Sequence, residues 1–256
     1  MPSLGRGFAA SGRDSAIVVF DLPTLRVVSR LPVPARFPDA LVYEPVTRRL
    51  FSFNGGSDNT SAFDAASGAF VDSLALGGTP EFAVADGAGL VYVNLESTAE
   101  VVAFDARSLH VLRRWSLAPG EEPTGLALDP VHHLLFSGCH NRLLVVSNAI
   151  QGTRVDTLAI GDGVDAVAFD ARRRTIFTSN GEGTLSVFTR QANGRYVPAE
   201  TDSTQRGART MALDEKTGRV FVVTANFGPP PAPTPERPHP RSSVVKDTFT
   251  VLVLDR

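Results

Sequence analysis

Short apolar runs separated by polar turn residues follow one another along the chain. The stretch 80–120 shows this pattern clearly, with apolar runs at 82–85, 90–94, 100–105 and 110–115. Runs of this length, rich in β-branched and aromatic residues and bounded by Gly, Asp, Asn and Ser, are typical of strands. Because none of the runs has the length of an ordinary helix, the stretch predicts four short strands.

This four-strand unit repeats about every 40 residues, the spacing of propeller blades. The residues that open the successive units are Pro38, Pro80, Pro123, Val164 and Ala208. A thin four-stranded sheet with two apolar faces can bury both of them only between neighbouring sheets. The sequence therefore predicts an all-β protein, a β-propeller of four-stranded antiparallel blades, as a single domain over residues 1–256. Phe20, Phe63, Phe104 and Phe188 recur once per unit and are predicted to form the core between blades.

The two ends of the chain depart from the regular unit. Residues 7–33 supply only three strands, with the first one missing, and residues 208–256 supply three, with the fourth one missing. We therefore expect about six blades, four of them complete. The last blade also carries a proline-rich insertion over residues 226–247, and prolines at this density disfavour sheet pairing. The insertion is interpreted either as a surface loop or as a lid or docking arm that uses Arg237, His239 and Arg241.

The second strand of the central unit reads Val91-Tyr92-Val93-Asn94, and related sequences occur at 51–54 and 177–180. Together with the repeat length, these residues resemble the YVTN-repeat β-propeller family, from about Gly5 to the end of the chain. The resemblance implies a bacterial, seven-bladed propeller exported to the periplasm or secreted. It implies that this chain is an incomplete ring without its signal peptide, in which the last strand at 248–255 is an unpaired apolar edge.

Composition narrows the functional classes. A net charge of −2 gives no general attraction to nucleic acid or to an anionic membrane. The single Cys139 excludes an internal disulfide, and no apolar run reaches transmembrane length. The sequence contains no nucleophile-elbow, phosphate-loop or metalloprotease motif. We therefore expect a monomer that binds a small molecule or a protein, with a non-catalytic role favoured over an enzymatic one.

The strand order predicts where a binding site would lie. In an antiparallel blade, the loop between the second and third strands lies at the same end as the segment that leads into the first strand. Because first strands line the channel of a propeller, we expect polar residues of these segments to surround one channel mouth. The candidate ligand-binding residues are Asp39, Glu81, Glu122, Asp165, Arg206 and Arg209 from the lead-in segments, and Asn54, Asn94, His140, Asn141 and Asn180 from the loops.

The acidic candidates also have a structural interpretation, because a carboxylate at a turn can accept backbone N–H bonds and brace the blade. Three carboxylates near Arg209 either form an ion-pair network or hold a cation such as Ca²⁺, for which Glu81 and Asp165 would be the oxygen ligands.

The main functional prediction is a non-catalytic ligand- or protein-binding scaffold that binds at the channel mouth. The first alternative is a metal-assisted lactonase-like hydrolase, in which the cation polarises a carbonyl group. The second is a nucleic-acid-binding propeller, in which arginines contact phosphates and binding depends steeply on salt. The arginines for that alternative are Arg206, Arg209, Arg237 and Arg241.

Overall fold

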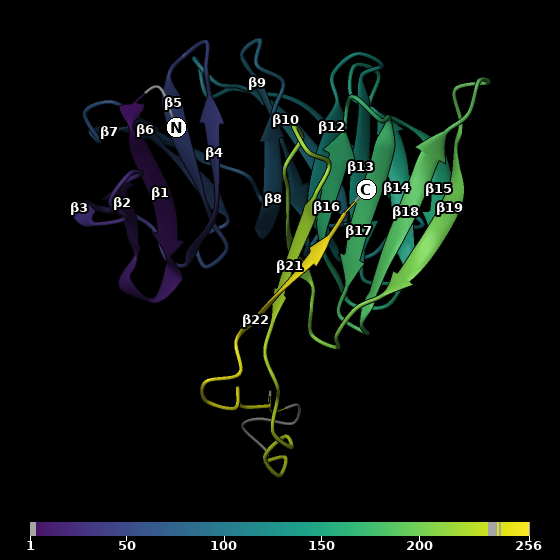
Figure 1. Ribbon diagram of the computed structural model, residues 1–256. Coiled ribbons are helices and arrows are strands. Elements are labelled where there is room, and N and C mark those ends of the chain that lie inside the picture. The colour runs from purple at the N-terminus through teal and green to yellow at the C-terminus, as the bar shows by residue number, and fades with distance from the viewer. Residues whose placement is uncertain (1–3, 235–239, 241, 256) are drawn as a thin grey trace. The chain divides into compact units, whose positions relative to one another are not determined.

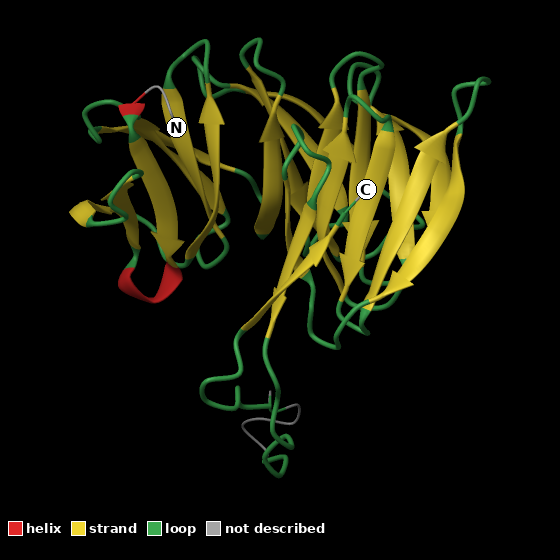
Figure 2. Ribbon diagram, viewed as in Figure 1, coloured by secondary structure: helices red, strands yellow, loops and turns green. Residues whose placement is uncertain are grey.

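Strands make up nearly all of the regular structure (Figure 2). The computed structural model describes residues 4–234, 240 and 242–255. Within these residues the strands form six antiparallel sheets, four with four strands and two with three. The sheets are blades of a β-propeller, so the predicted all-β fold and the four complete blades are confirmed. No helix among the described residues is long and apolar enough to cross a membrane.

The chain divides into two compact units, Met1–Leu158 and Ala159–Arg256, and the first unit contains four blades (Figure 1). Blade 1 consists of β1 (Arg6–Ser11), β2 (Ala16–Asp21) and β3 (Val27–Pro32), with the short 3₁₀ turn Gly12–Asp14 after β1. Blade 2 consists of β4 (Pro38–Glu44), β5 (Arg49–Asn54), β6 (Asn59–Asp64) and β7 (Phe70–Ala75). Blade 3 consists of β8 (Pro80–Ala85), β9 (Leu90–Leu95), β10 (Glu100–Asp105) and β11 (Val111–Ser116). Blade 4 consists of β12 (Pro123–Asp129), β13 (Leu134–Cys139), β14 (Leu143–Asn148) and β15 (Thr153–Ala159), so its last strand ends at the boundary.

The second unit contains blades 5 and 6. Blade 5 consists of β16 (Val164–Asp170), β17 (Thr175–Asn180), β18 (Thr184–Arg190) and β19 (Tyr196–Ser203). Blade 6 consists of β20 (Thr210–Leu213), β21 (Val220–Thr224) and β22 (Thr250–Leu254). Consecutive strands are neighbours within every sheet, and the predicted three-stranded sheets at both ends of the chain are present.

The proline-rich insertion separates β21 from β22, as expected, but its base is paired. Phe227 forms an antiparallel bridge with Val244. The Gly228 N–H donates to the Ser243 carbonyl at 2.9 Å, and the Val245 N–H donates to the Asn226 carbonyl at 2.8 Å. These residues flank the prolines, so their N–H groups remain available for pairing. Arg237, His239 and Arg241 lie outside the described residues.

Aromatic side chains form the core between neighbouring blades of the first unit. The ring of Phe104 on β10 meets those of Phe51 and Phe53 on β5, at centroid separations of 5.5 and 6.5 Å. Phe63 is buried in a cluster that includes Ile17 of blade 1. Core positions are therefore filled from both sides of the seam between blades 1 and 2 and of the seam between blades 2 and 3, as the repeat predicts. Of the four recurring phenylalanines, Phe63, Phe104 and Phe188 are buried and Phe20 is half-buried.

An aspartate closes the third strand of several blades and orders the following turn. In blade 3, Oδ1 of Asp105 accepts from the backbone N–H groups of Arg107 at 3.0 Å and Ser108 at 2.6 Å, and from the Ser108 hydroxyl at 2.8 Å. These hydrogen bonds favour the ionised carboxylate, so they lower the pKa of Asp105. The pKa of Asp64 is lowered in the same way, first by the Ser67 hydroxyl and then by the Ser67 N–H.

Acid should therefore weaken these turns. A carboxyl whose pKa is lowered by folding stabilises the protein above its unfolded value of 3.8, and this stabilisation is lost as the pH falls through the folded pKa. In the double variant Asp64→Asn, Asp105→Asn we expect the denaturation midpoint to fall less between about pH 5 and about pH 3 than in the parent. Blade 4 shows that asparagine fits the turn, because Asn148 Oδ1 accepts from the Ile150 and Gln151 N–H groups at 3.0 and 2.8 Å. Identical acid dependence in both proteins would contradict this assignment.

Candidate functional site

Two segments meet at one end of each complete blade: the lead-in segment before the first strand, and the loop between the second and third strands, called the 2–3 loop below. In blade 2, the Gly55 N–H donates to the Phe37 carbonyl at 3.0 Å. In blade 3, the Glu96 N–H donates to the Thr79 carbonyl at 2.9 Å. Blades 4 and 5 contain the same kind of bond. The structure thus places the two groups of candidate residues at the same end of each blade.

The first strand of each complete blade begins with a β-bulge. In blade 2, Pro38 pairs with Asn54 but Leu41 pairs with Ser52, so β4 contains one more residue than β5 over this step. Blades 3, 4 and 5 show an equivalent shift at the same place. The first residues within these bulges are Asp39, Glu81, Thr124 and Asp165. A bulge redirects a side chain relative to the regular sheet, and bulges are common beside functional sites.

Three of the four candidate asparagines, Asn54, Asn94 and Asn180, are buried and hydrogen-bonded within the protein. Asn94 Nδ2 donates to the carbonyl oxygens of Thr124 at 3.0 Å and Gly125 at 3.1 Å, and its Oδ1 accepts from Ser137 at 2.9 Å. It therefore ties blade 3 to blade 4. Asn54 and Asn180 have no exposed surface and bond to Ser and Thr side chains in their own blades. These contacts favour a bracing role for all three amides over contact with a ligand.

The candidates of blade 4 hold its 2–3 loop against its lead-in segment. Asn141 Nδ2 donates to the Pro119 carbonyl at 2.7 Å, and its Oδ1 accepts from the Glu121 N–H at 3.1 Å. His140 Nδ1 lies 3.2 Å from Oε2 of the exposed Glu122. The neighbouring Cys139 is fully buried, and burial raises the pKa of its thiol to about 12. The thiol is therefore protonated at neutral pH, which makes it a poor nucleophile or metal ligand.

In the second unit, two candidates form an ion pair. Arg209 Nη1 lies 3.6 Å from Asp165 Oδ1, with 46% and 25% of the two side chains exposed. The Thr210 hydroxyl donates to the other carboxylate oxygen of Asp165 at 3.1 Å. This arrangement matches the ion-pair interpretation of Asp165. Arg206 lies three residues before Arg209 and is exposed.

No three His, Cys, Asp or Glu side chains within the described ranges gather closely enough to hold a metal ion. Glu81 belongs to the first unit and Asp165 to the second. A Ca²⁺ site shared by these two carboxylates, and convergence of the acidic residues of both units on one mouth, remain predictions.

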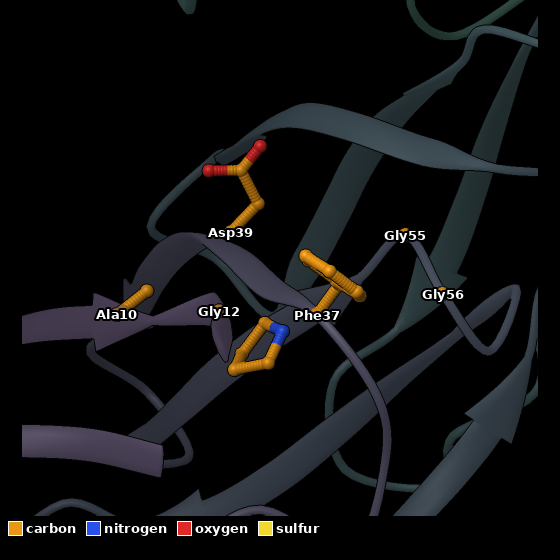
Figure 3. Close-up of a pocket in the computed structure, with 7 residues that line it drawn as sticks. Ala10, Gly12, Phe37, Asp39, Gly55 and Gly56 are labelled. Carbon is orange, nitrogen blue, oxygen red and sulfur yellow. The ribbon is translucent and has the colours of Figure 1, made fainter. Parts of the chain in front are cut away.

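A pocket of about 550 Å³ lies between blades 1 and 2 and is called the first seam pocket (Figure 3). Its lining residues are Ala10, Gly12, Phe37, Pro38, Asp39, Gly55 and Gly56. Phe37 is 60% exposed and has a φ of 52°, in the left-handed region that a bulky residue rarely adopts. The lead-in segment and the start of β4 therefore present an apolar ring and the carboxylate of Asp39 at the same opening.

A larger pocket of about 1080 Å³ lies between blades 5 and 6 and is called the second seam pocket. Its lining comprises Gly181, Gln205, Arg206, Gly207, Arg209, Ala225, Asn226, Phe227, Gly228, Pro229, Pro230 and Ser242. The two pockets are built alike. Each one combines the 2–3 loop of one blade with the lead-in segment and the 2–3 loop of the next blade. In blade 1, which lacks its first strand, the connection between β1 and β2 is the 2–3 loop.

Asp39, Arg206 and Arg209 were predicted from the sequence as binding residues and line these pockets, whereas the apolar and glycine walls were not predicted. Phe37 precedes the bulge proline of blade 2, and Gly207 occupies the equivalent place in blade 6 with a φ of 83°. Gly207 also needs its small size, because a Cβ there would lie 2.5 Å from the Phe227 ring. Neither position carries a polar side chain that would mark it in the sequence.

Comparison with known proteins identifies the fold and no family. No family model and no curated protein matches the sequence. Among solved structures, the chain is similar to hydrazine synthase of Kuenenia stuttgartiensis, with a TM-score of 0.72 and 16% identity over 86% of this chain and 73% of that one. It is also similar to a chain of the crystal structure of the mitotic checkpoint complex, with a TM-score of 0.72 and 15% identity. That match covers 82% of this chain and 65% of the other. At these identities the likeness establishes the β-propeller fold alone.

Proposed function

We propose that this protein is a ligand- or protein-binding β-propeller whose binding surface is the end of the blades that carries the lead-in segments and 2–3 loops. The observation that carries the proposal is the pair of seam pockets, one in each unit, built from equivalent segments. Phe37 supports it further, because its ring is 60% exposed and forms part of the wall of the first seam pocket. A YVTN-type repeat and export to the periplasm remain part of the proposal, based on residues 91–94 and on blade length.

Phe37→Gly tests the first seam pocket. Glycine adopts a φ of 52° without strain and removes the exposed ring, so we expect unfolding free energy to stay within about 1 kcal/mol of the parent. Binding should fall, because the apolar wall of the pocket is lost. The measurement is a ligand-observed NMR screen of a general fragment library against the parent, followed by titration of every fragment that binds against the variant.

Leu25→Gly is the matched control. Leu25 is 71% exposed with a φ of 56°, but it lies in the turn between β2 and β3, at the opposite end of its blade. This change also relieves the backbone strain of a left-handed apolar residue, and fragment binding should be unchanged by it. If every fragment bound the parent and both variants equally, the first seam pocket would not be a binding site.

A further inference from the structure

The second seam pocket differs from the first in its charge. Arg206 and Arg209 both line it, and no Asp or Glu is among its described lining residues. In the first seam pocket, the position equivalent to Arg209 is Asp39. Two guanidinium groups at one opening favour an oxyanion, because their fixed N–H donors match the geometry of a carboxylate.

We propose that the second seam pocket binds a peptide segment carrying an acidic side chain, and that the peptide's carboxylate displaces Asp165 from Arg209. This inference rests on the proposed function, since it names the ligand class of one of the two pockets. Arg206 and Arg209 would receive the carboxylate, and the apolar wall would hold the neighbouring residue.

Asp165 is suited to be a displaceable counter-ion. Its separation from Arg209 Nη1, 3.6 Å, exceeds the 2.7–2.9 Å typical of a charge-assisted hydrogen bond. The Thr210 hydroxyl holds the other oxygen of Asp165 at 3.1 Å, so the carboxylate keeps a partner when Arg209 turns away. Arg209 is therefore close to an internal acid that occupies it only loosely.

The rest of the lining suits a peptide. Gln205 Nε2 donates to Asn226 Oδ1 at 3.0 Å, which places two side-chain amides beside the arginines. Phe227 is 47% exposed, and Pro229 and Pro230 add apolar surface without N–H groups. A volume of about 1080 Å³ slightly exceeds the range of about 300–1,000 Å³ that is usual for small-molecule pockets. An apolar wall, paired amides and two cations together match an acidic side chain next to an apolar one on an extended chain.

The test is selection from a degenerate synthetic octapeptide library on the immobilised whole protein, followed by anisotropy titration of the enriched peptides. We expect enrichment of Asp or Glu beside an apolar residue. Arg206→Gln and Arg209→Gln should each weaken binding about tenfold or more, as expected for the loss of a charge-assisted hydrogen bond. Arg172→Gln is the matched control: it removes the same charge from the turn between β16 and β17, at the opposite end of blade 5, and should leave affinity unchanged.

Asp165→Asn should have the opposite effect and strengthen binding by up to about fivefold, because Arg209 loses its internal competitor. Glu215→Gln, in the turn between β20 and β21, makes the same change in net charge and should leave affinity unchanged. Thermal melts of all five variants establish that each one is folded.

The inference is overturned by an absence of binders, by enrichment without acidic residues, by affinities that the two arginine variants leave unchanged, or by weaker binding of Asp165→Asn. None of these results affects the fragment test at Phe37, which concerns the pocket of the first unit. If Phe37→Gly left fragment binding unchanged while the peptide selection succeeded, the binding surface would instead be confined to the second unit.

Discussion

Replacing Phe104 with alanine should lower the free energy of unfolding by about 3–5 kcal/mol, the usual range for a buried phenylalanine. The side chain of Phe104 is fully buried and lies edge-on against Phe51, with ring planes at 70°. Its removal leaves a cavity between blades 2 and 3 that strands held in ladders on both sides cannot close. Equilibrium denaturation in urea measures the loss.

Phe82→Ala is the matched control for this prediction. Phe82 lies in the same blade, on β8, but 38% of it is exposed, so we expect a loss smaller than that for Phe104. Comparable losses at the two positions would mean that the seam between blades 2 and 3 does not carry the stability assigned to it. The slope of the denaturation curve shows whether the first unit still unfolds as a whole. If only this seam were weakened, unfolding would cease to be two-state, and the slope would fall together with the midpoint.

The sequence predicts this seam because the apolar residues that fill it recur at the blade spacing. An apolar residue one position before the strand-ending Asp, as Phe104 precedes Asp105, recurs with the blade, and its burial follows from the need of each sheet to cover two faces. The turn after the strand follows as well, because Asp at that position with Ser or Thr three residues later is a known turn-forming pair. Fold class, blade number and the incomplete end blades could all be predicted on these grounds.

The candidate site was less predictable, because its side-chain directions depend on irregularities in the ladder. Alternation along a strand places side chains on one face or the other, but a bulge adds a residue and changes that assignment. Asp39 and Asp165 lie in such bulges, and no spacing in the sequence marks where a bulge occurs. Phe37 and Gly207 line the two pockets because the backbone turns left-handed just before the first strand of each blade. The next residue, Pro38 in one blade and Ala208 in the other, does not reveal that conformation.

The buried asparagines show a second reason why the candidate site was hard to predict. Asn94 ends the run that the sequence predicts to be a second strand, so the sequence places it at the channel mouth, and its polar side chain indicates contact with a ligand. In the structure the side chain turns inward and satisfies two carbonyl oxygens of β12. Its partners lie about 30 residues away in the chain, at the bulged start of β12 in the next blade, and only the packing of blade 3 on blade 4 brings them together.

Asn94→Asp should therefore destabilise the protein by about 3 kcal/mol or more, the scale for an uncompensated buried charge. The change keeps the shape of the side chain but replaces the Nδ2 donor with an oxygen, which faces the carbonyls of Thr124 and Gly125 at 3.0 and 3.1 Å. Burial and the two carbonyl dipoles both disfavour the ionised form, so folding raises the pKa of the introduced carboxyl. The folded state then binds the additional proton, and the variant should regain part of its stability relative to the parent as the pH falls from about 7 towards about 5.

Asn193→Asp is the matched control, because Asn193 is exposed and uses only Oδ1, which accepts from the Arg195 N–H at 3.0 Å. A carboxylate keeps that acceptor and an exposed aspartate stays ionised between about pH 5 and about pH 7, so denaturation curves of this variant should match the parent over that range. If Asn94→Asp were as stable as Asn193→Asp, the amide of Asn94 would not be a brace, and its place among the ligand-contacting residues would be restored. A loss of stability at Asn94 that was the same at both pH values would instead point to a packing defect, because only a buried, titrating carboxyl produces the pH dependence.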